Sequence, residues 1–209
     1  MHCDTLTECM DDGDSLLKNE RDIDFERGSI FGRWNQVFAV FVPDSMDDSL
    51  VEGYFDSACN FYFDELKKKG DVFPILSSED VRGHSRGVML AMESSRGVGS
   101  LERLEKLYER GLRLITLTWN HKNRAAGGCD EGGGLTDWGR ELVSKMEKLG
   151  IVTDVSHLSD RSFYDLCEFS DAPFIASHSD ARAVHNEVRS LTDEQIKIII
   201  ERGGLIGLN

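Results

Sequence analysis

The sequence predicts an α/β protein, specifically an incomplete (β/α)₈ TIM barrel that lacks its eighth strand. Short apolar runs alternate with amphipathic stretches along the chain, which is the pattern of βα units around a parallel sheet. The runs are rich in Val, Ile, Leu and Phe, as buried parallel strands are. No glycine-rich phosphate loop follows the first run, so an open nucleotide-binding sheet is the weaker alternative.

Seven strands are expected from these runs. They are His2–Thr5, Val37–Val42, Val88–Met92, Leu112–Thr118, Ile151–Val155, Phe174–Ala176 and Gly204–Leu208. A complete barrel has eight strands and typically ~250 residues, whereas this chain has 209. We therefore expect one partial barrel domain over residues 1–209, truncated at its C-terminus.

The helices between the runs have recognisable ends. Ser or Thr precedes four of them, at Ser100, Thr136, Ser159 and Thr192. The second of these helices is expected over Asp137–Leu149, with Gly150 as its stop signal. A longer helix is expected over about Asp47–Lys69, and the acidic stretch Asp11–Glu26 is expected to form a solvated loop or a short helix.

Composition narrows the range of functions. Lys and Arg number 24 against 38 Asp and Glu, a net charge of −14 without a basic stripe, which disfavours nucleic acid and anionic membrane surfaces as partners. No apolar run approaches ~18 residues, so no membrane span is expected. Five scattered cysteines and no basic-then-apolar leader pattern at the N-terminus predict reduced thiols in a cytoplasmic protein.

Titratable side chains gather where the expected strands begin or end. The first run opens with His2 and Asp4, and later runs are followed by Glu93, His157 and His178. In a parallel barrel the carboxyl ends of all strands meet at one rim, where active sites lie. Imidazoles and carboxylates without thiolates are typical ligands of hydrolytic zinc, and five ligands suit two ions that share a carboxylate. Each residue alone has an ordinary alternative, such as a hydrogen-bonded strand-end histidine.

Several segments together make the chain recognisable. They are HCDTL (2–6), QVFAVFV (36–42), LTWN (117–120), GLTDWG (134–139), LGIVTDVSHLS (149–159) and PFIASHSDARAV (173–184). In order and spacing these segments resemble the membrane (renal-type) dipeptidase family of zinc peptidases, peptidase family M19, in its bacterial branch. The resemblance implies a metallo-dependent hydrolase barrel that acts on dipeptides, with a homodimer as its expected assembly.

The resemblance also implies individual roles. His2 and Asp4 match the ligands of a first Zn²⁺, Glu93 matches the carboxylate that bridges two Zn²⁺ ions, and the family's second-zinc ligands match at His157 and His178. Arg189 matches the arginine that binds the substrate's carboxylate, a role that suits its bidentate guanidinium.

The chain departs from the family pattern at several places. Ser94 and Ser95 follow Glu93 where the family usually has two glycines, so the backbone there has less freedom. Trp119 stands where animal members have a substrate-contacting histidine. The glycine-rich loop 125–134 is expected to be a mobile loop on the substrate side. The family's eighth-strand aspartate, which handles a proton in hydrolysis, has no counterpart in these 209 residues.

The sequence therefore predicts a zinc-dependent dipeptidase that hydrolyses dipeptides to free amino acids. Two alternatives remain open at this point. The chain could be a catalytically inactive fragment of such an enzyme, or a related amidohydrolase that shares every ligand but acts on another amide, such as an acylated amino acid or a β-lactam.

Overall fold

The computed structural model describes all 209 residues and contains one parallel sheet. Its strands are β1 (His2–Cys3), β2 (Trp34–Phe41), β3 (Phe73–Pro74), β4 (Arg86–Glu93), β5 (Leu112–Thr116) and β6 (Val152–Asp154). The order across the sheet is β1-β2-β4-β5-β6, and β3 pairs with the first part of β4. The sheet is not closed, which confirms the prediction of an incomplete barrel.

The last two predicted strands are wrong as strands, although their segments continue the sheet in order. Ile175 forms an isolated parallel bridge with Asp154, and Ala176 forms another with Ile206. Pro173 has no N–H to donate at the start of the first segment. Each segment is therefore too short for a ladder, yet the two follow β6 in barrel order.

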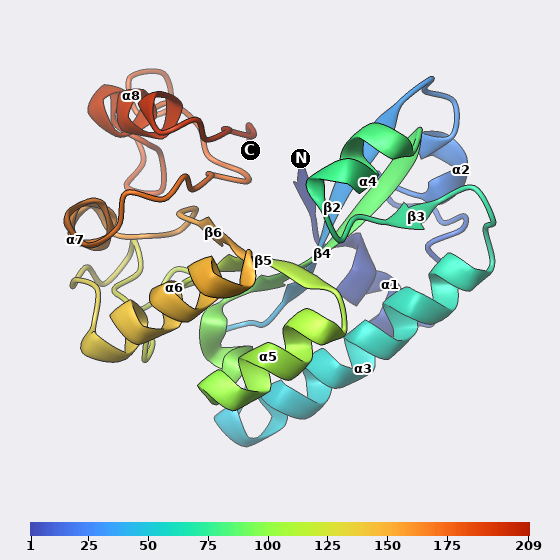
Figure 1. Ribbon diagram of the computed structural model, residues 1–209, viewed down its shortest axis with the longest axis horizontal. Helices are drawn as coiled ribbons and strands as arrows, with labels where there is room; N and C mark the ends of the chain where they lie inside the picture. The colour runs from blue at the N-terminus through green and yellow to red at the C-terminus, as the bar shows by residue number, and fades with distance from the viewer.

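The chain has eight α-helices. They are α1 (Thr5–Asp12), α2 (Phe25–Gly28), α3 (Asp48–Lys67), α4 (Ser78–Gly83), α5 (Leu101–Glu109), α6 (Asp137–Leu149), α7 (Asp160–Phe169) and α8 (Asp193–Glu201), with a 3₁₀ turn at Ser95–Val98. Helices α3, α5 and α6 lie on one side of the sheet and α4 lies on the other (Figure 1). All four predicted caps are confirmed. In α5 to α8 the hydroxyl of the Ser or Thr before the helix accepts a backbone N–H from its first turn.

Three short elements were not predicted from the sequence. The chain leaves β1 after Cys3 and begins α1 at Thr5, which shortens the expected strand His2–Thr5. The strand β3 has only two residues and α4 has six, so both are too short to produce a recognisable hydrophobic period in the sequence. Helix α4 does carry a capping box between Ser77 and Asp80, a local signal that the sequence contained.

The two faces of the sheet differ in composition. The outer face joins the helices in a core of 36 buried apolar residues, whereas the inner face carries a small layer of Val37, Ala39, Ala91 and Leu114. Side chains alternate along a strand, so Glu93 points to the same inner face as Ala91. The fold therefore places Glu93 one layer above a floor of small apolar side chains. No helix is both long enough and apolar enough to cross a bilayer.

Candidate metal centre

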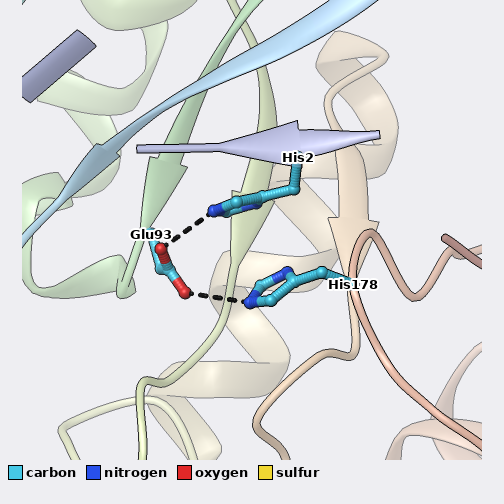
Figure 2. Close-up of side chains that lie close together, drawn as sticks. All are labelled: His2, Glu93 and His178. Atoms are coloured by element: carbon cyan, nitrogen blue, oxygen red, sulfur yellow. Dashed lines mark hydrogen bonds and ion pairs between the residues drawn. The ribbon is translucent and has the colours of Figure 1, made fainter. Parts of the chain in front are cut away.

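A buried carboxylate lies at the middle of the inner rim. Glu93, at the end of β4, is only 2% exposed. Its Oε2 lies 3.1 Å from His2 Nε2, and its Oε1 lies 2.9 Å from His157 Nε2 and 3.4 Å from His178 Nε2. Figure 2 shows the rings of His2 and His178 pointing from their own segments toward this carboxylate. Three imidazoles from distant parts of the sequence thus meet one carboxylate.

The fifth predicted ligand joins the group through His2. Asp4 Oδ1 lies 3.1 Å from His2 Nε2, and its side chain is 43% exposed, so it forms the open side of the cluster. The donor atoms of His2, Glu93 and His178 all lie within 4.8 Å of one another. His157 Nε2 lies 2.9 Å from His178 Nε2. The structure therefore brings all five predicted side chains together.

Local backbone conformation positions two of these side chains. His157 has φ 69°, in the left-handed region that residues other than glycine rarely adopt. Ser94, directly after Glu93, has φ 75°, a backbone conformation that glycine adopts more readily than serine. Strained backbone of this kind is typical of functional sites. The sequence predicted that the backbone after Glu93 has little freedom. The structure shows that Ser94 is held there with a positive φ, which glycine would adopt more easily.

The outer nitrogens of the three imidazoles are engaged by oxygen atoms. Ser177 Oγ lies 3.2 Å from His2 Nδ1 and 2.8 Å from His178 Nδ1, and Asn120 Oδ1 lies 2.8 Å from His157 Nδ1. Ser177 Oγ also donates to the buried Asp154 at 2.5 Å. Sequence reasoning missed these supporting residues. Ser177 lies in the segment PFIASHSDARAV directly before His178, and Asp154 lies in LGIVTDVSHLS three residues before His157. This closeness to the histidines in the sequence was the signal that could have identified them.

Electrostatics keep the centre carboxylate ionised. Burial alone would raise the pKa of Glu93, but hydrogen bonds from His157, His178 and His2 hold it well below its usual range. Burial likewise opposes the charge on His2, yet hydrogen bonds to Asp4 and Glu93 and their negative charges raise its pKa to about 10. Burial lowers the pKa of His157, and the nearby charge of Arg189 adds to that effect.

Arg189 reaches the same rim from the segment between the bridge residues Ala176 and Ile206. Its Nη2 donates to the carbonyl oxygen of His178 at 2.6 Å and lies 3.2 Å from His157 Nε2, while its Nη1 donates to Ser179 Oγ at 2.9 Å. Burial lowers the pKa of its guanidinium. Arg189 and His157 line a pocket of about 310 Å³ beside the cluster, together with Trp119 and Asn120. A cation at a pocket wall suits a substrate carboxylate.

Other residues singled out in the sequence lie around the cluster. Trp119 packs edge-on against Phe41, with ring centroids 5.1 Å apart, and lies 6.2 Å from the His157 ring. In the glycine-rich loop 125–134, the backbone N–H of Cys129 donates to the carbonyl of His157 at 2.9 Å. His121 is half exposed and pairs with Asp44 at 2.7 Å, outside the cluster. All five cysteines are free thiols, as predicted.

The donor set fits divalent zinc. The Nδ1 atom of each imidazole is held by an oxygen, which leaves the three Nε2 atoms as the nitrogens that face Glu93. A histidine that binds a metal through one nitrogen almost always engages a carbonyl, carboxylate or water with the other. Imidazole and carboxylate donors without thiolate are the ligands of hydrolytic zinc centres.

Comparison with known proteins supports this interpretation. Residues 2–209 match the family model of membrane dipeptidase, peptidase family M19. An uncharacterized protein in the PQQ-III 3′ region of Acinetobacter calcoaceticus is 32% identical over 141 residues, 63% of this chain and 45% of that protein. An uncharacterized protein in the pqqA 5′ region of Klebsiella pneumoniae is 33% identical over 147 residues, 64% of this chain and 54% of that protein. The chain spans about half the length of these curated relatives.

Solved structures agree with the family match. A metallo peptidase of family M19, dipeptidase AC, superposes with a TM-score of 0.89 at 25% identity, over 100% of this chain and 70% of that one. A metallo peptidase from Rhodobacter sphaeroides, bound to a phosphinate mimic of the dipeptide L-Ala-D-Ala, shares the fold with a TM-score of 0.88 at 24% identity, over 100% of this chain and 72% of that one. The chain therefore belongs to the membrane dipeptidase family, peptidase family M19.

Proposed function

We propose that this chain is a zinc-dependent dipeptidase that hydrolyses dipeptides to free amino acids. In this proposal His2, Asp4, Glu93, His157 and His178 hold two zinc ions, which Glu93 bridges. The observation that carries the proposal is the meeting of three imidazole Nε2 atoms at the buried carboxylate of Glu93. In the metal-free cluster the imidazole nitrogens share protons with the Glu93 carboxylate. Zinc would displace these protons on binding, because metal ligands have to be deprotonated.

The chemistry of such a centre follows from the donor set. When bound, a pair of zinc ions polarises a peptide carbonyl and makes water a nucleophile near neutral pH. The chain's own residues supply orientation and charge. Glu93 contributes the central negative charge, and its low pKa supports its ionised form at neutral pH. Asp4 provides the exposed edge of the group, on the side where a substrate would enter.

Arg189 is proposed to bind the C-terminal carboxylate of the dipeptide. Its guanidinium contacts the ligand cluster directly, 3.2 Å from His157 Nε2 and 2.6 Å from the carbonyl oxygen of His178, and it lines the adjacent pocket. A fixed, buried cation so close to the ligands would select short substrates, because the scissile bond and the terminal carboxylate of a dipeptide are close together. This arrangement favours dipeptides over longer peptides.

The test is hydrolysis of a panel of dipeptides by the purified chain with and without zinc. Glu93→Gln should lower kcat/KM by at least about 100-fold, because the amide keeps the shape but removes the central charge. Glu109→Gln is the matched control, since Glu109 is exposed on α5 and distant from the cluster. Undiminished dipeptide hydrolysis by the Glu93→Gln protein would refute the proposal.

The same panel separates the related amide chemistries. It should include acylated amino acids and a β-lactam, because an amidohydrolase with another substrate would share every ligand. Turnover of these compounds in preference to dipeptides would replace the proposed substrate class while leaving the metal centre in place. Zinc binding without turnover of any amide would contradict the proposed activity of this chain.

A further inference from the structure

One serine hydroxyl lies between two of the imidazoles that face Glu93. Ser177 Oγ is 3.2 Å from His2 Nδ1, 2.8 Å from His178 Nδ1 and 2.5 Å from Asp154 Oδ2. Neither Ser177 nor Asp154 is exposed to solvent at all. The Ser177 hydroxyl is therefore shielded from bulk water, and these three side chains are its hydrogen-bond partners.

The surroundings of Asp154 decide which way the hydroxyl proton points. Asp154 Oδ1 accepts the backbone N–H groups of Ser156 at 3.0 Å and Ser177 at 2.9 Å, and its Oδ2 accepts the Thr116 hydroxyl at 2.8 Å. Asp154 is thus an acceptor in every other contact that it makes. We infer that the Ser177 proton is also donated to Asp154, in a charge-assisted hydrogen bond.

The two lone pairs of the hydroxyl then determine which nitrogen carries the proton in the rings of His2 and His178. A serine hydroxyl has one proton and two lone pairs. With its proton donated to Asp154, Ser177 can only accept, and its two lone pairs face His2 Nδ1 and His178 Nδ1. Both rings must therefore carry a proton on Nδ1. In a neutral ring this leaves the lone pair on Nε2, the atom that faces Glu93.

We propose that Ser177 and Asp154 are positioning residues that set the Nδ1–H form of His2 and His178 together. This inference rests on the proposed function, in which His2 serves one ion and His178 serves the other. One buried hydroxyl would then prepare one ligand of each ion, so the two sites would be coupled through Ser177. His157 has a separate support, because only Asn120 Oδ1 engages its Nδ1, at 2.8 Å.

Zinc titration with competing chelators distinguishes these two kinds of support. Ser177→Ala should weaken the binding of both zinc ions by about 10- to 100-fold, the usual effect of losing a group that orients a metal ligand. Asn120→Ala should weaken only one. Thr153→Val is the control, since Thr153 lies on β6 beside Asp154 and its side chain points to the opposite face of the sheet. Loss of a single site in Ser177→Ala would overturn the inference.

A nearly isosteric change tests the direction of the serine proton. In Asp154→Asn the amide oxygen should stay with the two backbone N–H groups, which places the NH₂ group against Ser177 and Thr116. Ser177 would then accept from the amide and donate its own proton to one imidazole Nδ1. That ring would have to carry its proton on Nε2. Asp154→Asn should therefore weaken zinc binding although the protein remains folded, as checked by circular dichroism.

A second readout needs neither zinc nor turnover. Nδ1–H is present whether a ring is neutral or cationic, so its proton resonance can be followed in metal-free protein labelled with ¹⁵N-histidine. Two exchange-protected Nδ1–H signals, from His2 and His178, should disappear in Ser177→Ala and persist in Thr153→Val. Their absence from the unmodified protein, or their survival in Ser177→Ala, would refute the inference. Failure to bind zinc with both signals present would refute only the proposed function.

Discussion

At the scale of single residues, the backbone after Glu93 carries a cost. Ser94 has φ 75° and ψ 116°, a combination that suits glycine and strains any residue with a Cβ. Its neighbour Ser95 instead donates its hydroxyl to the carbonyl of Leu117 at 2.7 Å, and this bond ties the turn to the end of β5. The turn aims Glu93 into the barrel, and the Ser94 hydroxyl offsets little of the strain, because it accepts only one long hydrogen bond, from Asn123 Nδ2 at 3.3 Å.

Replacing the strained serine should stabilise the chain. Ser94→Gly is expected to raise the free energy of unfolding by about 1 kcal/mol, because the relief of strain exceeds the entropy that glycine adds to the unfolded state. Ser95→Gly should have the opposite sign, since it removes a buried hydrogen bond. Urea denaturation of both variants measures the two changes. A destabilised Ser94→Gly protein would show that the conformation is not strained.

At the scale of elements, helix ends and helix interiors use glycine for different reasons. Gly150 ends α6 with φ 80°, and Gly53 lies inside α3 without a positive φ. A Cβ at either position would meet nothing within 4 Å. Any effect of Gly→Ala at these sites therefore comes from backbone conformation and not from crowding.

The two glycines should respond to alanine in opposite ways. Gly150→Ala is expected to lower the free energy of unfolding by about 1 kcal/mol, because alanine resists the left-handed conformation of the cap. Gly53→Ala should raise it by about 0.5–1 kcal/mol, because alanine favours a helix interior. Thermal or urea unfolding of the matched pair gives both signs. Equal signs would contradict this account of the helix ends.

The carboxylate of Asp160, at the start of α7, makes the stability of the fold depend on pH. Asp160 pairs with both terminal nitrogens of Arg182 at 2.8 Å and accepts from Gln195 at 3.0 Å. The hydrogen bonds from Arg182 lower the pKa of Asp160 despite partial burial. Because the folded pKa is depressed, this stabilisation is present above the ordinary value near 3.8 and is lost as the pH falls through the folded value.

Asp160→Asn should therefore cost stability only where Asp160 is ionised. We expect a loss of at most about 1 kcal/mol at neutral pH, since the side chain is half exposed and solvent screens the pair. The difference from the unmodified chain should shrink as the pH falls below 3.8 and through the lowered pKa of Asp160. Asp171→Asn, an exposed position, is the control. A loss from Asp160→Asn that stays constant down to the acid range would argue against the ion pair.

At the scale of the whole molecule, the candidate ligands come from both ends of the chain. His2 lies on β1, Glu93 on β4, and His178 follows the bridge between Asp154 and Ile175. The two termini also approach each other (Figure 1), and a Cβ on Gly207 would lie 3.2 Å from Met1 Cβ. A metal bound by these ligands would connect strands that the open sheet leaves unconnected by hydrogen bonds.

Zinc should therefore stabilise the folded chain as a whole. At a free concentration 100 times its dissociation constant, a ligand that binds only the folded state adds about 2.7 kcal/mol. For a chain of this size that corresponds to a rise in Tm of roughly 5–10 °C. Calorimetry with added zinc and with a chelator measures the shift, and Glu93→Gln should show a smaller one. An unchanged Tm would mean that zinc does not bind the folded state.

The sequence predicted the incomplete barrel and the gathering of five candidate ligands, and the physical reasons for this also explain where it was wrong. Buried strands and helix caps depend on local sequence patterns, so the sequence predicted them correctly, as at the caps Ser100 and Thr136. The segments around Ile175 and Ile206 had strand composition, but pairing depends on neighbours, and only single bridges formed. The role of Ser177 depends on three contacts across the barrel, which no local pattern reveals.

The central claim is that five side chains form a centre for two zinc ions bridged by Glu93. The most direct test is the metal content of the purified chain after zinc loading, measured by mass spectrometry beside dipeptide hydrolysis. We expect about two zinc ions per chain, with fewer in the Glu93→Gln protein and turnover only in the loaded, unmodified chain. A folded chain that retains no zinc would contradict it.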